Sequence, residues 1–149
     1  MANMSDYLEN KLIDHIFRAT AFTMPSAITI ALLTTLAGDS DTGGTIVEVS
    51  GGSYARVSVP PSTANWLSTN GLASGASSGT GGATNNVAAI TFPVATANWG
   101  TIVGVAILDS ITLGAGNVLF YGPLAINKTV NTNDTFQFAA NQLSIQIDN

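Results

Sequence analysis

The hydrophobic pattern of the first twenty residues has the period of an α-helix. Leu8, Leu12 and Ile16 repeat at intervals of four residues, which places an apolar stripe along one side of a helix. Ser5 is a favourable N-cap, and the acidic side chains that follow it oppose the positive end of the helix dipole. The sequence therefore predicts an N-terminal helix over residues 5–19.

After Pro25 the period changes to two, which is typical of half-buried strands. Ile28, Ile30 and Leu32 alternate with Thr29 and Ala31. Further short strand-forming stretches follow, separated by Gly, Asn and Asp turns: 46–49, 54–59, 87–92, 101–108, 117–121, 135–138 and 142–147. About eight such strands favour an all-β fold, an antiparallel β-sandwich of jelly-roll-like or Ig-like type with one N-terminal α-helix.

Two of these stretches also predict which side chains face the core. Residues 101–108 are apolar on both faces, which indicates a central strand covered on both sides. Strict alternation assigns its side chains to two faces: Ile102, Ala106 and Leu108 on one, and Val103, Val105 and Ile107 on the other. In the last stretch, alternation predicts that three side chains point inward: Leu143, Ile145 and Ile147.

The tract 68–86 consists almost entirely of Gly, Ser, Thr, Ala and Asn, and it predicts a long Gly/Ser-rich loop. Neither side of this tract is long enough to form a domain alone. We therefore expect the 149 residues to form a single β-sandwich domain.

The composition points to a chain that is surrounded by neighbours. Hydrophobic residues make up 46% of it and charged residues only 9%, against about 25% in an average soluble protein. Interspersed charge keeps free monomers apart, and a chain packed into an assembly needs less of it.

The net charge of −5, with only 4 basic residues, argues against nucleic-acid binding. The absence of cysteine excludes disulfides, thiolate metal sites and a Cys nucleophile.

The sequence shows no signal for membrane insertion or export. Its longest apolar stretches, 27–33 and 102–108, are far shorter than the roughly 20 residues that a membrane-spanning helix needs. The N-terminus carries acids and amides where a signal peptide would have basic residues and an apolar run. We expect neither membrane insertion nor Sec export.

The candidate catalytic residues lack the context that catalysis requires. The run 75–79 matches the G-x-S-x-G pattern around Ser77, but no strand precedes it and no helix follows it. His15 is the single histidine, and no Ser or Cys is placed for it to activate. The sequence therefore predicts no catalytic residue and no enzyme activity.

Two further patterns are ambiguous but favour structural roles. Asp39, Asp41 and Gly44 imitate the first half of a calcium loop, but Ser50 stands where the bidentate Glu belongs, so a solvated turn is favoured over a weak ion site. We expect no bound metal and no cofactor. Five aromatic residues are more typical of core packing than of an exposed carbohydrate-binding surface: Tyr54, Trp66, Trp99, Phe120 and Tyr121.

The N-terminal helix is the predicted assembly element. Three of the nine acidic and two of the four basic residues fall within 6–18. A helix of this length is marginal alone in water, so it must dock on its own sandwich or on a neighbouring subunit, and the small sandwich favours the neighbour. The residues that we expect at this interface are Tyr7, Lys11, His15 and Arg18.

Several segments, in order along nearly the whole chain, resemble a family of short proteins encoded among tailed-phage structural genes and commonly labelled tail-fibre or minor tail proteins. The segments that carry the resemblance are 5–10, 17–18, 48–56, 89–93, 99–100, 120–122 and 128–130. The Gly-Gly-Ser-Tyr-Ala-Arg run at 51–56 is its most specific part, and the tract 68–84 is longer and poorer in side chains than the family usually has.

The resemblance implies a bacteriophage virion structural protein that is made in the bacterial host cytoplasm and assembled into the particle. It implies contacts with other phage structural proteins and a homo-oligomer, for example a trimer, and it implies no catalytic residues. Placement on the tail, as a fibre, tail-tip or baseplate component, is favoured. Capsid decoration on the head is the first alternative, and a carbohydrate-binding β-sandwich module is the second.

Overall fold

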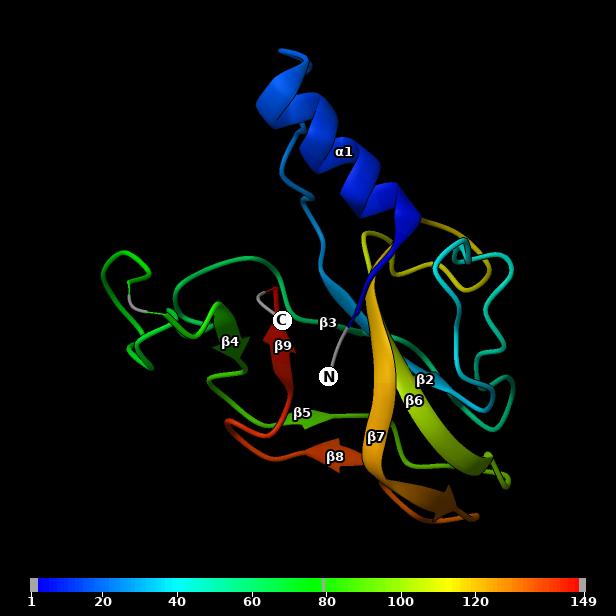
Figure 1. Ribbon diagram of the computed structural model, residues 1–149. Coiled ribbons are helices and arrows are strands. Elements are labelled where there is room, and N and C mark those ends of the chain that lie inside the picture. Colours follow the sequence, from blue (N-terminus) through cyan, green and yellow to red (C-terminus); the bar gives the residue numbers. More distant parts are fainter. Residues whose placement is uncertain (1–2, 79, 148–149) are drawn as a thin grey trace.

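A five-stranded antiparallel sheet forms the centre of the fold (Figure 1). The computed structural model describes residues 3–78 and 80–147. Strands of the sheet, in the order in which they lie side by side, are β1 (Asn3–Met4), β7 (Val118–Val130), β6 (Gly100–Leu108), β2 (Thr29–Leu33) and β3 (Val57–Ser58).

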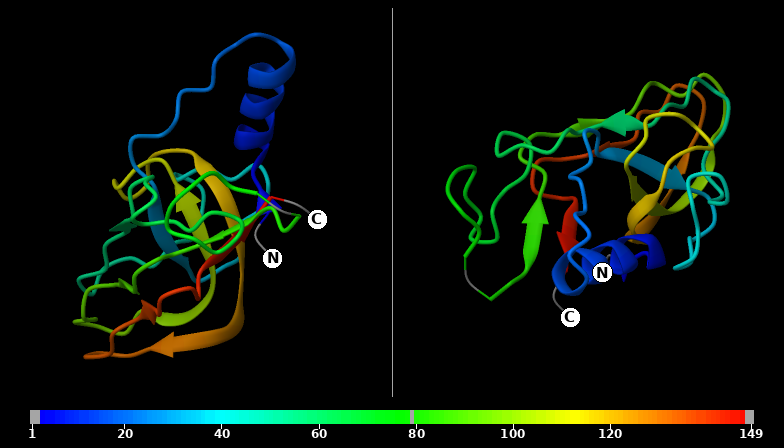
Figure 2. Two further views of the ribbon diagram at one scale, coloured as in Figure 1. Left: turned by 90° about the vertical axis from the view of Figure 1, so that its left-hand side faces the viewer. Right: turned by 90° about the horizontal axis from the view of Figure 1, so that it is seen from above.

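Two smaller antiparallel sheets pack against one face of the large sheet (Figure 2). One pairs β4 (Ala83–Asn85) with β9 (Ser144–Gln146), and the other pairs β5 (Ile90–Thr91) with β8 (Gln137–Phe138). Side chains of the small sheets and of the large sheet share one apolar core. The predicted all-β sandwich is thus confirmed, and its second layer contains β4, which lies within the Gly/Ser-rich tract.

The central strand β6 is covered on both faces, as its composition predicts. Ile107 packs in the main core between the sheets, and Ala106 and Leu108 pack in a smaller cluster on the opposite face. The prediction that Ile102 shares a face with Ala106 and Leu108 was wrong, because Ile102 packs in the main core. The pairing of β6 with β7 shifts register between Ile102 and Gly104, and across this irregularity strict alternation no longer predicts the face on which Ile102 lies.

The neighbouring strand β7 continues well beyond the predicted end at residue 121. Its pairing with β6 is irregular. Gly104 of β6 pairs with Pro123, and Ile102, two residues earlier, pairs with Lys128, which is five residues after Pro123. The segment of β7 between these pairs is therefore three residues longer than the facing segment of β6, and it arches away from β6. Ile126 stands on this arch with 84% of its surface exposed.

The last strand ends earlier than the alternating pattern predicts. Leu143 and Ile145 are buried, as expected, but Ile147 is 61% exposed. The prediction for Ile147 was wrong because β9 ends at Gln146, and beyond the strand the alternation no longer determines which way a side chain faces.

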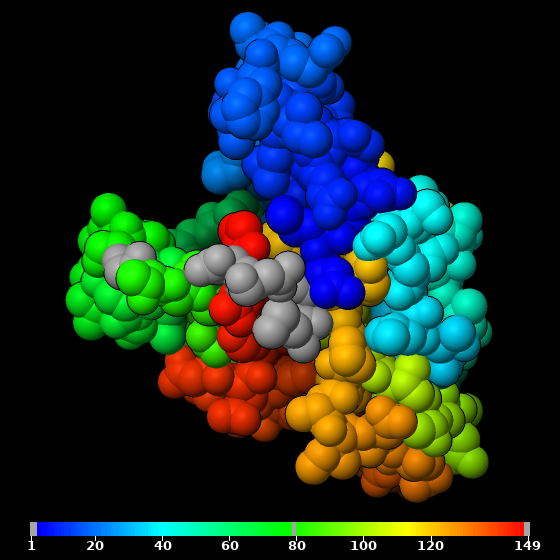
Figure 3. Space-filling view, in the orientation of Figure 1, coloured from blue at the N-terminus to red at the C-terminus, as the bar shows by residue number. Residues whose placement is uncertain are grey.

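The predicted N-terminal helix is present as α1 (Asp6–Phe17). Ser5 is its N-cap and accepts a hydrogen bond from the Leu8 N–H at 3.3 Å. Ser5 is fully buried, its backbone N–H donates to the Leu119 carbonyl, and its hydroxyl donates to the Val118 carbonyl. These bonds tie the first turn of α1 to β7, while the rest of the helix stands clear of the sandwich (Figure 3).

Candidate functional site

The four predicted interface residues, on or at the end of α1, are Tyr7, Lys11, His15 and Arg18. Lys11 Nζ lies 5.7 Å from the centroid of the Tyr7 ring. Arg18 Nε forms an ion pair with Asp14 Oδ1 at 2.9 Å, and His15 Nδ1 accepts a hydrogen bond from the Phe22 N–H at 3.2 Å. These local contacts stabilise the helix and the turn that follows it.

The apolar side of α1 is also exposed in the single chain. Leu8 is the buried residue of the helix, whereas Ile16 is 65% exposed and Phe17 is 78% exposed. The sequence predicts that the stripe containing Ile16 docks on the chain's own sandwich or, with preference, on a neighbouring subunit. We call Ile13, Ile16 and Phe17 the open face of α1, because all three are exposed in the single chain.

A second open apolar surface lies at the other end of the sandwich. It is a groove of about 630 Å³ between the arch of β7 and the segment that contains β8, and we call it the β7–β8 groove. Its larger apolar side chains are Leu124, Ile126, Phe136, Phe138 and Leu143. In Figure 1 and in the side view of Figure 2, α1 projects from one end of the molecule and β8 lies at the opposite end.

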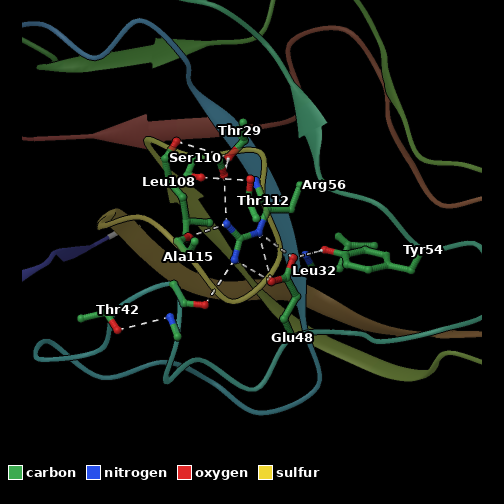
Figure 4. A network of polar contacts seen from close by, with 12 residues as sticks. Thr29, Leu32, Thr42, Glu48, Tyr54, Arg56, Leu108, Ser110, Thr112 and Ala115 are labelled. Carbon is green, nitrogen blue, oxygen red and sulfur yellow. Dashed lines mark hydrogen bonds and ion pairs between the residues drawn. The ribbon is translucent and has the colours of Figure 1, made fainter.

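The most developed polar site in the interior is an ion pair between Glu48 and Arg56, and both side chains are almost completely buried (Figure 4). Arg56 Nε donates to both carboxylate oxygens of Glu48 at 3.0 Å, and Nη2 donates to Oε2 at 2.8 Å. Nη1 donates to the carbonyls of Ser110 and Ala115 at 2.9 and 2.8 Å, and Nη2 also reaches the Gly43 carbonyl at 3.4 Å. The guanidinium therefore joins two loops, around 43 and around 110–115, to the large sheet.

Tyr54 extends this network into the core. Its hydroxyl donates to Glu48 Oε1 at 2.7 Å and accepts from the Leu32 N–H on β2 at 2.8 Å. Burial raises the pKa of the Tyr54 phenol far above its ordinary value of 10.0, and the negative charge of Glu48 raises it further. Tyr54 therefore works as a neutral hydrogen-bonding group, and the whole network is structural.

The raised pKa of Tyr54 gives a testable pH dependence. The folded chain binds the phenolic proton of Tyr54 more tightly than the unfolded chain does, because the pKa is higher in the folded chain. The stabilisation of the fold by the neutral phenol is therefore complete below about pH 10 and is lost as the pH rises above that value. In an alkaline titration we expect the phenolate absorbance of Tyr54, identified by comparison with Tyr54→Phe, to appear together with the loss of circular dichroism. Phenolate formation by Tyr54 in a chain that is still folded would contradict this assignment.

The turn between Glu48 and Arg56 explains the glycines of this segment. Gly51, Gly52 and Ser53 all have positive φ angles, which favour Gly. A Cβ on Gly52 would lie 2.9 Å from Trp99 Nε1, and the Gly52 carbonyl accepts the indole N–H at 2.9 Å. The turn is predicted by the sequence, but the ion pair was not predicted. The available signal was two opposite charges, Glu48 and Arg56, on either side of an uncharged, glycine-containing turn in a charge-poor chain.

The other sequence candidates make contacts close to them in the chain. Ser77 Oγ accepts a hydrogen bond from the Thr69 N–H at 3.3 Å, while His15 lies on α1; Gly79, the last residue of the G-x-S-x-G match, is outside the described residues. Asp41 accepts from the Gly38 N–H and the Thr45 hydroxyl at 2.8 Å each. No group of three His, Cys, Asp or Glu side chains in residues 3–78 and 80–147 could hold a metal ion.

The five aromatic residues that the sequence assigns to core packing are buried or half-buried. Tyr54, Trp99 and Tyr121 are buried, and Trp66 and Phe120 are half-buried. Tyr54 packs edge-on against Trp99, with ring centroids 5.3 Å apart.

Among the residues described, no helix is long and apolar enough to span a membrane.

Comparison with protein families shows what the chain is similar to. A family model described as podophage GP4 fiber I protein gp80 matches residues 3–146, nearly the whole chain. No curated protein matches the chain.

Proposed function

Because the chain belongs to the family of the podophage GP4 fiber I protein gp80, we propose that it is a non-enzymatic structural component of a phage tail fibre, assembled through subunit contacts. As a member of a phage fibre family it is part of the virion. In this proposal it is made in the host cytoplasm, and it joins a homo-oligomer and other virion proteins through α1.

The observation that carries this proposal is the open face of α1. A 12-residue helix is marginal in water, and its stability in proteins comes mainly from packing an apolar face. This helix is anchored at Leu8 but leaves Ile13, Ile16 and Phe17 exposed. A neighbouring subunit that covers these side chains would stabilise the helix and bind the chain into an assembly.

The roles of the polar residues of α1 follow from the same geometry. Tyr7, Lys11, His15 and Arg18 lie at the margin of the contact in this proposal, where exposed charges give orientation and specificity more than affinity. The apolar face supplies most of the binding energy through burial. The family match also favours the tail over the head as the place of assembly.

A phage mutant that lacks this chain tests the proposal. We expect particles with filled heads, with fibre density missing from the tail in electron micrographs, and with adsorption to host cells strongly reduced. Supplying the wild-type chain in trans should restore both properties, and a tagged chain should be labelled at the tail. Intact fibres on particles whose mass spectra lack this chain would contradict the proposal.

A further inference from the structure

We infer that the open face of α1 docks in the β7–β8 groove of a second copy of this chain, an inference that rests on the proposed function. The open face consists of Ile13, Ile16 and Phe17, and the groove is the apolar hollow beside the arch of β7. An amphipathic helix that lays its apolar side in a hydrophobic groove is a recurrent mode of recognition.

The positions of the two surfaces select a second copy as the occupant. The α1 helix projects from one end of the sandwich, and the groove lies at the opposite end, so a chain cannot fill its own groove with its own helix (Figures 1 and 2). Docking between copies covers both apolar surfaces in one contact. Pairing of α1 with another α1 would cover the helices and leave every groove open to water.

The charges of the two surfaces are complementary. The complementarity lies in single side chains near the contact, because residues 6–18 as a whole carry three acidic and two basic residues, which gives −1. The helix end carries the exposed pair Asp14 and Arg18, and the groove end carries Lys128 and, in the turn before β8, the exposed Asp134. Asp14 therefore has Lys128, and Arg18 has Asp134, as an opposite charge to meet on the neighbour.

A contact of this kind is head-to-tail, because different surfaces of the two copies meet. Every added copy presents a new free helix at one end and a new free groove at the other. Such a contact repeats into a ring when the rotation closes and into a stack when it does not. Either outcome suits a component of a fibre.

Exposed residues allow the contact to be broken without disturbing the fold. Phe17→Asp places a charge on the open face of α1, and Ile126→Asp places one on the rim of the groove; both native side chains are at least 78% exposed. Val47→Asp, at a 52% exposed position on neither surface, is the control. In sedimentation velocity over a concentration series, we expect the wild type and Val47→Asp to self-associate and the other two variants to remain monomers.

Mixing the two monomeric variants is the decisive measurement. The Ile126→Asp chain keeps a functional helix and the Phe17→Asp chain keeps a functional groove, so the mixture should form one species of twice the 15.2 kDa chain mass. A monomeric wild type, an associating Ile126→Asp variant, or a mixture without dimers would each overturn the inference. Pairing between α1 helices would need Phe17 but not Ile126.

The experiment separates this inference from the proposed function. Mass spectrometry of purified particles tests whether the chain is a virion component, independently of how copies meet. Particles that contain the chain, combined with variants that form no dimer on mixing, would overturn the docking and leave the proposed function standing. A dimer on mixing, combined with particles that lack the chain, would do the reverse.

Discussion

Replacing Arg56 with Met is expected to lower the free energy of unfolding by about 3–5 kcal/mol, the usual cost of breaking a buried ion pair from one side. Methionine keeps the aliphatic volume but removes every donor of the guanidinium. The Glu48 carboxylate then stays buried without its cation, and the carbonyls of Ser110 and Ala115 lose their hydrogen bonds. Denaturant unfolding should show a lower midpoint with an unchanged m-value.

The matched control is Arg18→Met, which breaks the ion pair with Asp14 on the exposed end of α1. Exposed pairs contribute little, so we expect a change of no more than about 0.5 kcal/mol. The double variant Glu48→Gln with Arg56→Met should recover part of the loss, because it leaves no buried charge uncompensated. Equal losses from Arg56→Met and Arg18→Met would show that burial of the pair does not matter.

The sequence was sufficient to predict those elements whose pattern extends over many residues. The helix has an N-cap at Ser5 and a repeat of apolar residues, and residues 101–108 are apolar throughout, so both elements are found where they were predicted. Such long patterns determine which side chains must be buried, and hence the all-β class. The turn at 50–53 was recognisable because its glycines permit positive φ angles.

Features that depend on contacts between distant segments could not be predicted. The register shift next to Ile102 arises from the pairing of β6 with β7, and the local alternation of the sequence does not indicate it. The strand β4 forms in a Gly/Ser-rich tract because β9 is there to pair with it. The exposure of Ile16 has the same origin, since the helix pattern shows an apolar side but not whether the chain itself covers it.

The assembly role of α1 stays a prediction, and the structure adds an apolar face to it. The charge concentrated in 6–18 predicts the helix as the contact, with Tyr7, Lys11, His15 and Arg18 as its residues. The structure shows Lys11 and Arg18 in contact with Tyr7 and Asp14, beside an exposed apolar face. The β7–β8 groove was missed because it depends on the arch of β7, three residues longer than its partner requires.

An aspartate introduced on either face of β6 is expected to lower the free energy of unfolding by at least about 4 kcal/mol. The substitution removes a large buried apolar side chain and also buries a polar group, and each change destabilises the fold. Ile102→Asp tests the main core, and Leu108→Asp tests the cluster on the opposite face; both native side chains are fully buried. The control is Ile111→Asp, three residues after the end of β6 and at an exposed position, which should change the free energy of unfolding by no more than about 0.5 kcal/mol. The total free energy of unfolding of a small domain is only about 5–15 kcal/mol, so the two core variants should unfold at a much lower denaturant concentration or yield no folded protein. Wild-type stability of Leu108→Asp, with strong destabilisation by Ile102→Asp, would mean that the smaller cluster is open to water and that β6 is covered on one face alone.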